Sequence, residues 1–187
     1  MEEKNKIIPV YLLVIFMAVF IGTGVFLILN NKKLPSGKEA ASTAVKQTQG
    51  SLNLELSGNE TLSVNKEFAI DVVADSNKKN IVGYDLVLYY DTSSFEFVNA
   101  TSNITDFKIY SYSKGNYLSF LATKTLQGQA SSVFTQTKIA SIIFKPKKAG
   151  KFNFALKPLL GGDKTDLVTD KTEVLNPGLN ELKVEVF

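Results

Sequence analysis

The chain has 187 residues, of which 44% are hydrophobic and 21% are charged, so it can hold one domain with a packed core and additional segments. It contains no His, no Cys and no Trp, and every basic residue is Lys. These absences exclude disulfide bonds, the usual zinc, iron–sulfur and haem ligand sets, and the Ser-His-Asp and Cys-His catalytic systems.

The net charge of +3 is unevenly distributed along the chain. Residues 1–50 hold six Lys and three Glu, whereas residues 51–187 hold 15 Lys and 15 acidic residues. The chain also has no Arg for bidentate contacts with phosphate or guanine. We therefore do not expect nucleic acid as a partner.

Residues 7–29, IIPVYLLVIFMAVFIGTGVFLIL, are an apolar run without any charge. A helix of this length spans the hydrocarbon core of a bilayer, which is about 30 Å thick. Tyr11 lies near one expected interface, and Lys32 and Lys33 flank the other. A buried helix of a soluble protein is seldom apolar on all sides over such a length. The pattern predicts a short N-terminal tail, residues 1–6, and a single transmembrane helix, residues 7–29.

A cleaved signal peptide is the alternative to an uncleaved anchor. Its apolar region is normally shorter, about 7–15 residues, and is followed directly by a small-x-small cleavage site. Here the nearest such segment, Ala40-Ala41-Ser42, lies well downstream of Leu29. Lysines flank both sides of the apolar run, so charge alone does not decide the orientation. Our prediction is a single-pass protein of the cell membrane, with its C-terminal domain outside the cytoplasm.

Residues 30–50 lack apolar periodicity and are rich in Lys, Ser, Thr, Ala and Gln, which predicts a flexible linker reaching roughly 25 Å. From Ser51 onward, apolar and polar residues alternate as in half-buried strands, and turn-forming segments such as SKGN and NPG separate them. The predicted strands are residues 52–56, 68–74, 82–90, 95–98, 107–112, 117–122, 139–144, 151–156, 173–175 and 181–187. This pattern predicts an all-β domain over 51–187, an antiparallel β-sandwich of about nine strands.

Several of these segments resemble the cohesin domain family. FAIDVVA at 68–74, VGYDLVLYYD at 82–91 and FEFV at 95–98 are similar to the family's opening strands, in which V-x-G-F-x-x-x-L-x-Y-D precedes L-x-F. IASIIFKPKKAGKFNF at 139–154 resembles its L-A-x-L-x-F-x-x-x-x-x-G segment, and VEVF at 184–187 resembles its closing strand. Tyr84, Phe95 and Thr92 stand where the family usually has Phe, Leu and Pro. The resemblance covers residues 51–187 and implies a jelly-roll sandwich.

The resemblance implies a binding module rather than an enzyme, with no cofactor. Its partner would be a dockerin domain of a secreted polysaccharide-degrading enzyme. Two alternatives stay open: a carbohydrate-binding module that holds a polysaccharide directly, and a structural surface domain without a specific ligand. The absence of Trp weakens the carbohydrate alternative, because Tyr would have to supply all of the stacking surface.

A cohesin-like fold would place strands 82–90, 107–112, 117–122 and 139–144 in one sheet. Side chains on its inner face would include Leu86, Ile109, Phe120 and Ile142. The outer face would show Asp85, Val87, Tyr89, Tyr110, Tyr112, Tyr117, Leu121 and Ile143. Tyr-rich apolar surfaces with a polar rim suit the recognition of proteins or sugars. We predict that this face binds the partner, the alternative being that a loop or a second copy covers it.

Acidic residues suggest two further features. In GGDKTDLVTD, Asp163, Asp166 and Asp170 could offer oxygen ligands to calcium, but the segment lacks the D-x-D-x-D-G spacing of a calcium loop, so a solvated loop is expected. Asp91 follows the strand 82–90. Because Asp side chains accept hydrogen bonds from backbone N–H groups two residues on, we expect Asp91 to stabilise a turn.

Overall fold

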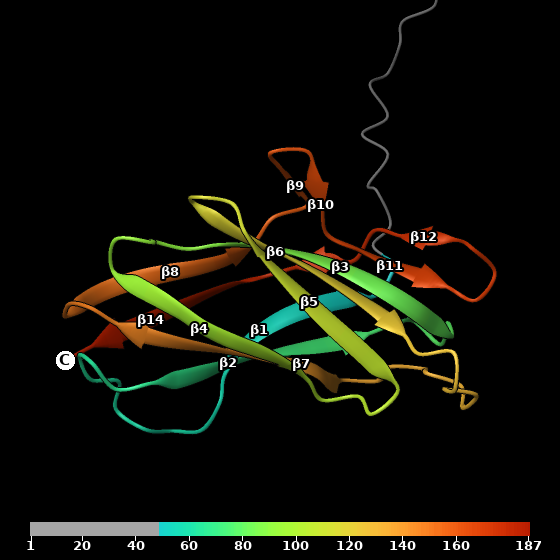
Figure 1. Cartoon of the computed structure of the whole chain (residues 1–187), viewed down its shortest axis with the longest axis horizontal. Helices are drawn as coiled ribbons and strands as arrows, with labels where there is room; N and C mark the ends of the chain where they lie inside the picture. The colour runs from blue at the N-terminus through green and yellow to red at the C-terminus, as the bar shows by residue number, and fades with distance from the viewer. Residues whose placement is uncertain (1–48) are drawn as a thin grey trace, which may run out of the picture. The chain divides into compact units, whose positions relative to one another are not determined.

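The computed structural model describes residues 49–187, which form an all-β sandwich (Figure 1). The predicted tail, the predicted transmembrane helix and nearly all of the predicted linker lie outside the described residues. Between residues 49 and 187 there is no helix that could cross a bilayer.

The first sheet has the strand order β13-β1-β2-β7-β4. Its members are β1 (Ser51–Leu56), β2 (Phe68–Asp75), β4 (Phe95–Ser102), β7 (Thr137–Pro146) and β13 (Gly178–Leu179). Strands β1 and β13 run parallel, and the other neighbours are antiparallel. Strand β7 therefore lies inside this sheet, between β2 and β4.

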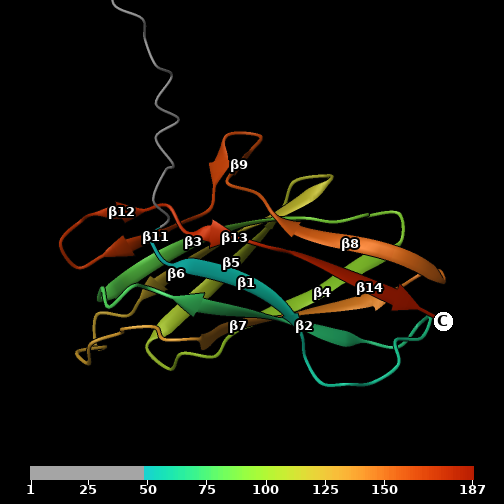
Figure 2. The same ribbon diagram turned by 180° about the vertical axis from the view of Figure 1, so that it is seen from behind.

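The second sheet has the strand order β12-β11-β3-β6-β5, and β8 joins it by pairing with both β3 and β14. Its members are β3 (Ile81–Tyr89), β5 (Phe107–Ser113), β6 (Tyr117–Lys124), β8 (Gly150–Leu156), β11 (Asp166–Thr169), β12 (Val174–Leu175) and β14 (Glu181–Val186). A separate hairpin, β9 (Leu159–Leu160) and β10 (Asp163–Lys164), stands out from the layer that contains β3 and β6 (Figures 1 and 2).

The predicted strands are confirmed, with small shifts at their ends. Within residues 49–187, nine strands are six residues or longer, namely β1 to β8 and β14, and the segment predicted as 95–98 extends to Ser102. One expectation about the sheets is wrong: residues 139–144 lie in β7 and do not share a sheet with β3, β5 and β6. Ile142 of β7 instead lies opposite Ile70 of β2 and Ala100 of β4. Alternation defines the two faces of a strand but not its neighbours, so the sequence pattern left this pairing undetermined.

The core between the two sheets is rich in aromatic rings. Phe144 of β7 lies at the centre of the larger cluster, with its ring centroid 5.0 Å from those of Tyr90 and Phe154 and 6.4 Å from that of Phe95. On the opposite side of the core, alternate residues of β3 point inward. Tyr84, Leu86 and Leu88 of β3 and Tyr90 just after it are all buried. The predicted inner-face residues Leu86, Phe120 and Ile142 are buried as well, and Ile109 packs against the core.

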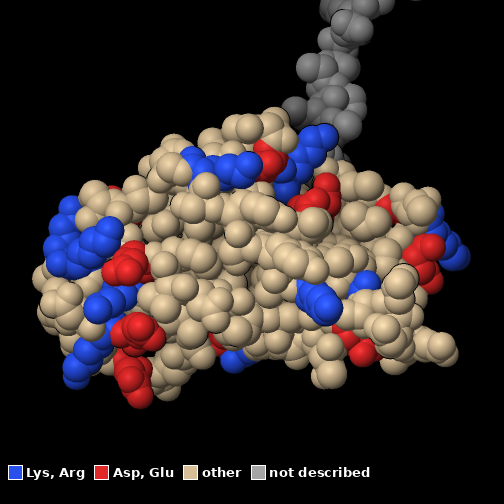
Figure 3. All heavy atoms as spheres, viewed as in Figure 1, with Lys and Arg blue, Asp and Glu red and all other residues tan. Residues whose placement is uncertain are grey.

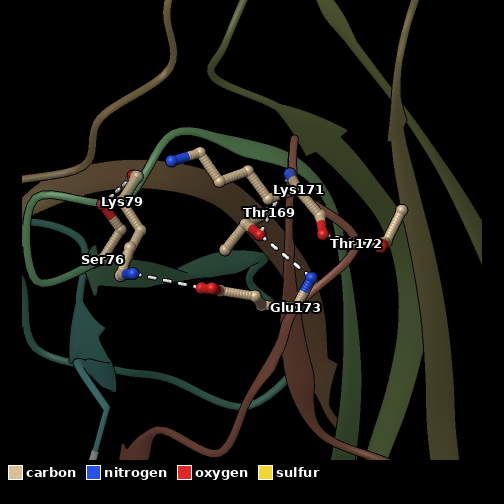
Figure 4. Close-up of polar contacts among 6 residues, drawn as sticks. All are labelled: Ser76, Lys79, Thr169, Lys171, Thr172 and Glu173. Carbon is tan, nitrogen blue, oxygen red and sulfur yellow. Dashed lines mark hydrogen bonds and ion pairs between the residues drawn. The ribbon is translucent and has the colours of Figure 1, made fainter.

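Two turns at one end of the sandwich are joined by polar contacts (Figure 4). In the turn between β2 and β3, the Ser76 hydroxyl donates to the carbonyl of Lys79 over 2.7 Å. In the turn between β11 and β12, Thr169 Oγ1 accepts from the backbone N–H of Glu173 over 3.1 Å. Lys79 Nζ and Glu173 Oε2, 3.1 Å apart, link the two turns. These contacts fix the start of β3 beside the end of β11.

Asp91 stabilises the turn between β3 and β4, as predicted. Its Oδ1 accepts from the backbone N–H of Ser93 over 2.9 Å and from the Ser93 hydroxyl over 2.6 Å, while Oδ2 accepts from the Ser94 hydroxyl. These hydrogen bonds favour the ionised carboxylate and lower the pKa of Asp91 to about 2.

We expect Asp91→Ala to lower the free energy of unfolding by about 1 kcal/mol at neutral pH, because the turn loses its acceptor. The folded pKa lies below the unfolded value of about 3.9, so this contribution is complete above about pH 4 and declines as the pH falls toward 2. Urea unfolding of both proteins at pH about 7 and about 2.5 would measure the difference. A difference that is equal at both pH values would contradict this assignment.

Candidate functional site

The outer face of β3, β5 and β6 brings together most of the predicted partner-binding residues. Asp85 of β3 lies opposite Leu121 of β6, which lies opposite Tyr110 of β5, so these three side chains form one row. The next row consists of Val87, Ser119 and Tyr112, and after it Tyr89 lies opposite Tyr117. The alternation predicted for these strands is therefore confirmed.

Four large side chains of this face are exposed to solvent. The exposed fractions are 41% for Tyr89, 46% for Tyr110, 48% for Tyr112 and 43% for Leu121. We call these four residues the tyrosine face. Lys157 Nζ lies 5.8 Å from the centroid of the Tyr89 ring, a distance that permits a cation–π contact. Tyrosine rings offer large, rigid apolar surfaces with a polar hydroxyl at one end.

Two of the predicted residues point outward but are covered. Val87 is 0% and Tyr117 is 7% exposed. The Tyr117 hydroxyl donates to Asp163 Oδ2 in β10 over 3.0 Å, and the Tyr117 ring lies so close to Gly161 that a Cβ there would be 2.4 Å from the hydroxyl oxygen. The β9–β10 hairpin thus packs on Tyr117, and the expectation that Val87 and Tyr117 are exposed is wrong.

Ile143 is not part of this surface. It lies in β7 of the other sheet, opposite Ala69 of β2 and Asn99 of β4. Its outward orientation follows the predicted alternation, but the sheet is different, so the expectation that Ile143 joins the outer face of β3, β5 and β6 is wrong.

Carboxylates gather between the tyrosine face and the hairpin. Asp85 of β3 lies directly opposite Asp166 of β11, and Asp163 of β10 is close enough to act on Asp85 electrostatically. Burial raises the pKa of Asp85, and the neighbouring charges of Asp166 and Asp163 raise it further. Burial also raises the pKa of Asp166, which the charge of Lys164 partly offsets. The Oδ1 atom of Asp166 is buried and has no hydrogen-bond partner.

A groove of about 310 Å³ lies beside these carboxylates, between β5 and the hairpin. Its floor is formed by Asp85, Ser119 and Leu121 of β3 and β6. Phe120 of β6 also borders the groove, and its sides are formed by Tyr112 of β5 with Lys114 just after it, and by Asp163 and Lys164 of β10.

A larger hollow of about 430 Å³ lies over β8 and β14, but its polar groups are largely paired. Lys151 Nζ is 3.7 Å from Glu185 Oε1, and Asn153 Nδ2 donates to Glu181 Oε2 over 2.9 Å. Figure 3 shows Lys and acidic side chains next to one another at this end of the molecule. Because Lys151, Asn153 and Glu185 are engaged in these contacts and the lining aromatic side chain, Phe152, is only partly exposed, we do not place the site at this hollow.

The three carboxylates considered as possible calcium ligands make separate contacts. Asp163 accepts from Tyr117, Asp166 lies opposite Asp85, and Asp170 Oδ2 accepts from Asn80 Nδ2 over 2.9 Å. Across residues 49–187, no three acidic side chains are arranged so as to hold a metal ion.

The sequence pattern did not reveal the β9–β10 hairpin. Its second half, Asp163–Lys164, belongs to a segment that was expected to be a solvated loop, because strands of two residues are too short to show a period of two. The signal that could have revealed the hairpin is the Gly161-Gly162 pair, because both residues have positive φ, 59° and 93°, and such pairs favour tight hairpin turns.

Residues 49–187 thus form a two-layer β-sandwich, and the sheet that contains β3, β5 and β6 exposes three tyrosines on its outer face. The family model of the cohesin domain matches residues 52–175, and the chain therefore belongs to the cohesin domain family. A search of curated proteins finds no match to the sequence.

Solved structures with the same fold include three cohesins of low sequence identity. The cohesin module of a family 33 glycoside hydrolase from Clostridium perfringens has a TM-score of 0.63 and 11% identity, covering 74% of this chain and 97% of its own. The sixth cohesin of scaffoldin B from Acetivibrio cellulolyticus, solved with a mutant Cel5 dockerin, has a TM-score of 0.57 and 13% identity, covering 75% and 100%. The third ScaB cohesin of R. flavefaciens, solved with a group 1 dockerin, has a TM-score of 0.52 and 19% identity, covering 76% and 98%.

Proposed function

We propose that this protein is a membrane-anchored cohesin module that binds a dockerin-type protein domain outside the cytoplasm, in a system for polysaccharide degradation. The single observation that carries the binding proposal is the tyrosine face, which exposes Tyr89, Tyr110, Tyr112 and Leu121 on one sheet. Membership of the cohesin family supports the choice of partner, because the cohesins of A. cellulolyticus and R. flavefaciens were solved with dockerins.

Large exposed apolar side chains contribute to the binding free energy when a partner removes them from water. Single exposed apolar residues are common, but Tyr110 lies directly opposite Leu121 and Tyr112 lies in the next row, so three large exposed side chains are neighbours, as is often seen at interaction sites. Aromatic side chains at the centre of an interface often account for most of the binding free energy. The buried positions on the same strands keep the backbone rigid, so the tyrosines are held in place before the partner arrives.

We expect Tyr112→Ala to weaken dockerin binding at least about tenfold, the equivalent of about 1.4 kcal/mol, while the domain stays folded. Isothermal titration of the full chain, purified in mild detergent, with a panel of dockerin modules and with soluble glycans would measure the effect. The matched control is Val98→Ala, since Val98 is 41% exposed, close to the 48% of Tyr112, but lies on β4 of the other sheet.

The outcomes separate the candidate functions. Saturable binding of a dockerin that Tyr112→Ala weakens and Val98→Ala leaves intact supports the proposal. Saturable binding of a glycan alone would replace it with a carbohydrate-binding function, which the exposed tyrosine rings could serve by stacking on sugars. If neither a dockerin nor a glycan binds, the remaining candidate is a structural surface domain without a specific ligand.

The anchoring part of the proposal rests on residues 7–29. We expect the full-length 20.5 kDa chain to stay with the membrane fraction after a carbonate wash, because an apolar run of this length inserts stably. Protease added to intact cells should digest the β-sandwich domain. A shorter soluble form that begins near Ser42 would instead indicate a cleaved signal peptide.

A further inference from the structure

Asp85 and Asp166 place two like charges next to each other within the second sheet. Asp85 of β3 lies directly opposite Asp166 of β11 and has Leu121 of β6 on its other side. Side chains at directly opposite positions of antiparallel strands have Cβ atoms about 4.5–5.5 Å apart, so the two carboxyl groups can contact each other. When both are ionised, they repel each other and destabilise the pairing of β11 with β3.

Among the residues that the structure describes, no lysine pairs with either carboxylate. None of the ion pairs within 4.0 Å in residues 49–187 involves Asp85 or Asp166, and the buried Oδ1 of Asp166 has no hydrogen-bond donor. The other charged groups around the pair are Asp163 and Lys164 of β10 and Lys114 just after β5. The two lysines balance the net charge of the groove without neutralising the contact between Asp85 and Asp166.

The remaining neighbours of the pair add no further charge. Tyr112 of β5 lines the same groove, and the Tyr117 hydroxyl of β6 donates to Asp163 over 3.0 Å. Strand β12, which pairs with β11, consists of Val174 and Leu175. The electrostatic environment of the pair is therefore set by its own two carboxyl groups and by the three charged residues nearby.

Both carboxyl groups bind a proton more readily in the folded chain than in an unfolded one. Burial raises the pKa of Asp85, and the charges of Asp166 and Asp163 raise it further. Burial also raises the pKa of Asp166, against the opposing effect of Lys164. Because two interacting carboxyl groups titrate as one unit, the pair takes up its first proton at a higher pH than its second.

The pair lies in a part of the sheet that few backbone contacts hold. Strand β11 has four residues, its pairing with β3 is irregular between Val168 and Thr169, and its other neighbour, β12, has two residues. Strands β8 and β11 both run antiparallel to β3 along one line, and the β9–β10 hairpin leaves the sheet after Leu156 and returns at Asp166. The interaction between Asp166 and Asp85 therefore affects how firmly the returning end of the hairpin is held.

We propose that Asp85 and Asp166 form an acid-sensitive pair, in which one proton taken up from solvent joins the two carboxyl groups and strengthens the pairing of β11 with β3. The protonated carboxyl group donates its O–H to the carboxylate of the other residue, so a charge-assisted hydrogen bond replaces the repulsion. This inference goes beyond the proposed function and does not depend on it.

The direction of the pH dependence follows from the raised pKa of the pair. Unfolded aspartate has a pKa of about 3.9, so between this value and the folded pKa the folded chain binds more protons than the unfolded chain. The contribution of the pair to stability therefore appears as the pH falls through the folded pKa and is complete below about pH 4. Asp71, Asp91 and Glu181 have lowered pKa values and act in the opposite direction. Their effects are shared by the wild type and by variants of the pair, so they cancel in a comparison.

The test compares thermal midpoints of the full chain and its variants in mild detergent, over a series from about pH 7.5 to about pH 4.5. We expect Asp166→Asn to raise the midpoint by at least about 2 °C at the highest pH, because the amide removes the repulsion and can donate to Asp85. The gain over the wild type should shrink as the pH falls, since the wild-type pair then acquires its proton. Glu96→Gln is the matched control, because Glu96 is an exposed carboxylate of β4 that lies opposite Lys145, and it should not raise the midpoint at any pH.

A second variant tests whether the two residues act as a pair. Asp85→Asn should also raise the midpoint at about pH 7.5, and the double variant with Asp166→Asn should gain no more than the better single variant. Gains that persist at the lowest pH, gains that add in the double variant, or the absence of a gain in either single variant would overturn the inference. The midpoints are measured without a partner, so failure of this inference is distinguishable from failure of the proposed function.

Discussion

Phe144→Ala is expected to destabilise the β-sandwich by about 3–5 kcal/mol, a large share of the 5–15 kcal/mol that typically separates folded and unfolded domains. Phe144 is fully buried in β7, and its ring lies within 5.0 Å of both Tyr90 and Phe154, measured between centroids. Tyr90 follows β3 and Phe154 lies in β8, so the ring joins the two layers. Removing it would leave a cavity that the surrounding rings can fill only in part.

Urea denaturation followed by circular dichroism would measure the change in the free energy of unfolding. Phe187→Ala is the matched control because Phe187 is 66% exposed, and its removal should cost less than about 0.5 kcal/mol. A loss below about 1 kcal/mol for Phe144→Ala would show that the ring is not packed as described.

Leu88→Ala is expected to cost about 2–5 kcal/mol and to lower the thermal midpoint by more than about 5 °C. Leu88 is fully buried at the point where β3 lies between Leu118 of β6 and Leu156 of β8. Its neighbour Tyr89 faces the opposite side of the sheet. Substitutions at Leu88 and at Tyr89 therefore test folding and partner binding separately, at adjacent positions of one strand.

Leu88→Ala should lower stability while the fraction that remains folded binds its partner with nearly wild-type affinity. Differential scanning calorimetry and titration of the same protein sample would test both statements. A midpoint change below about 2 °C would mean that Leu88 does not lie in the core. Tenfold weaker binding at a temperature where the variant is fully folded would mean that the core position also shapes the site.

The sequence pattern predicted which side chains of a strand face the core, but it did not predict which strands pair with one another. Alternation placed Leu86 and Phe120 inside and Tyr110 and Tyr112 outside, because a side-chain period of two follows from strand geometry alone. Residues 139–144 pair with β2 and β4, which are distant in sequence. No local pattern encodes such pairing, and for this reason Ile143 was assigned to the wrong sheet.

The covering of Val87 and Tyr117 could not be predicted for a related reason. Whether an outward side chain meets solvent depends on what other segments lie above it. Here the cover depends on hydrogen bonds between Thr165 and Val87, 78 residues apart, and between Tyr117 and Asp163, 46 residues apart. These contacts exist only after the sandwich has formed, so neither composition nor periodicity indicates them.

Strands β8 and β11 lie end to end along β3, so the β9–β10 hairpin between them can be replaced by other loops. Because the two strands lie along one line on β3, the segment between Lys157 and Thr165 can change in length and composition without altering the register of the sheet. Mutations that diversify this loop would change what the surface selects while the scaffold stays constant, much as antibody loops vary on a fixed framework. A library randomised at residues 158–164, with Thr165 retained, would be a route to cohesin variants of new specificity.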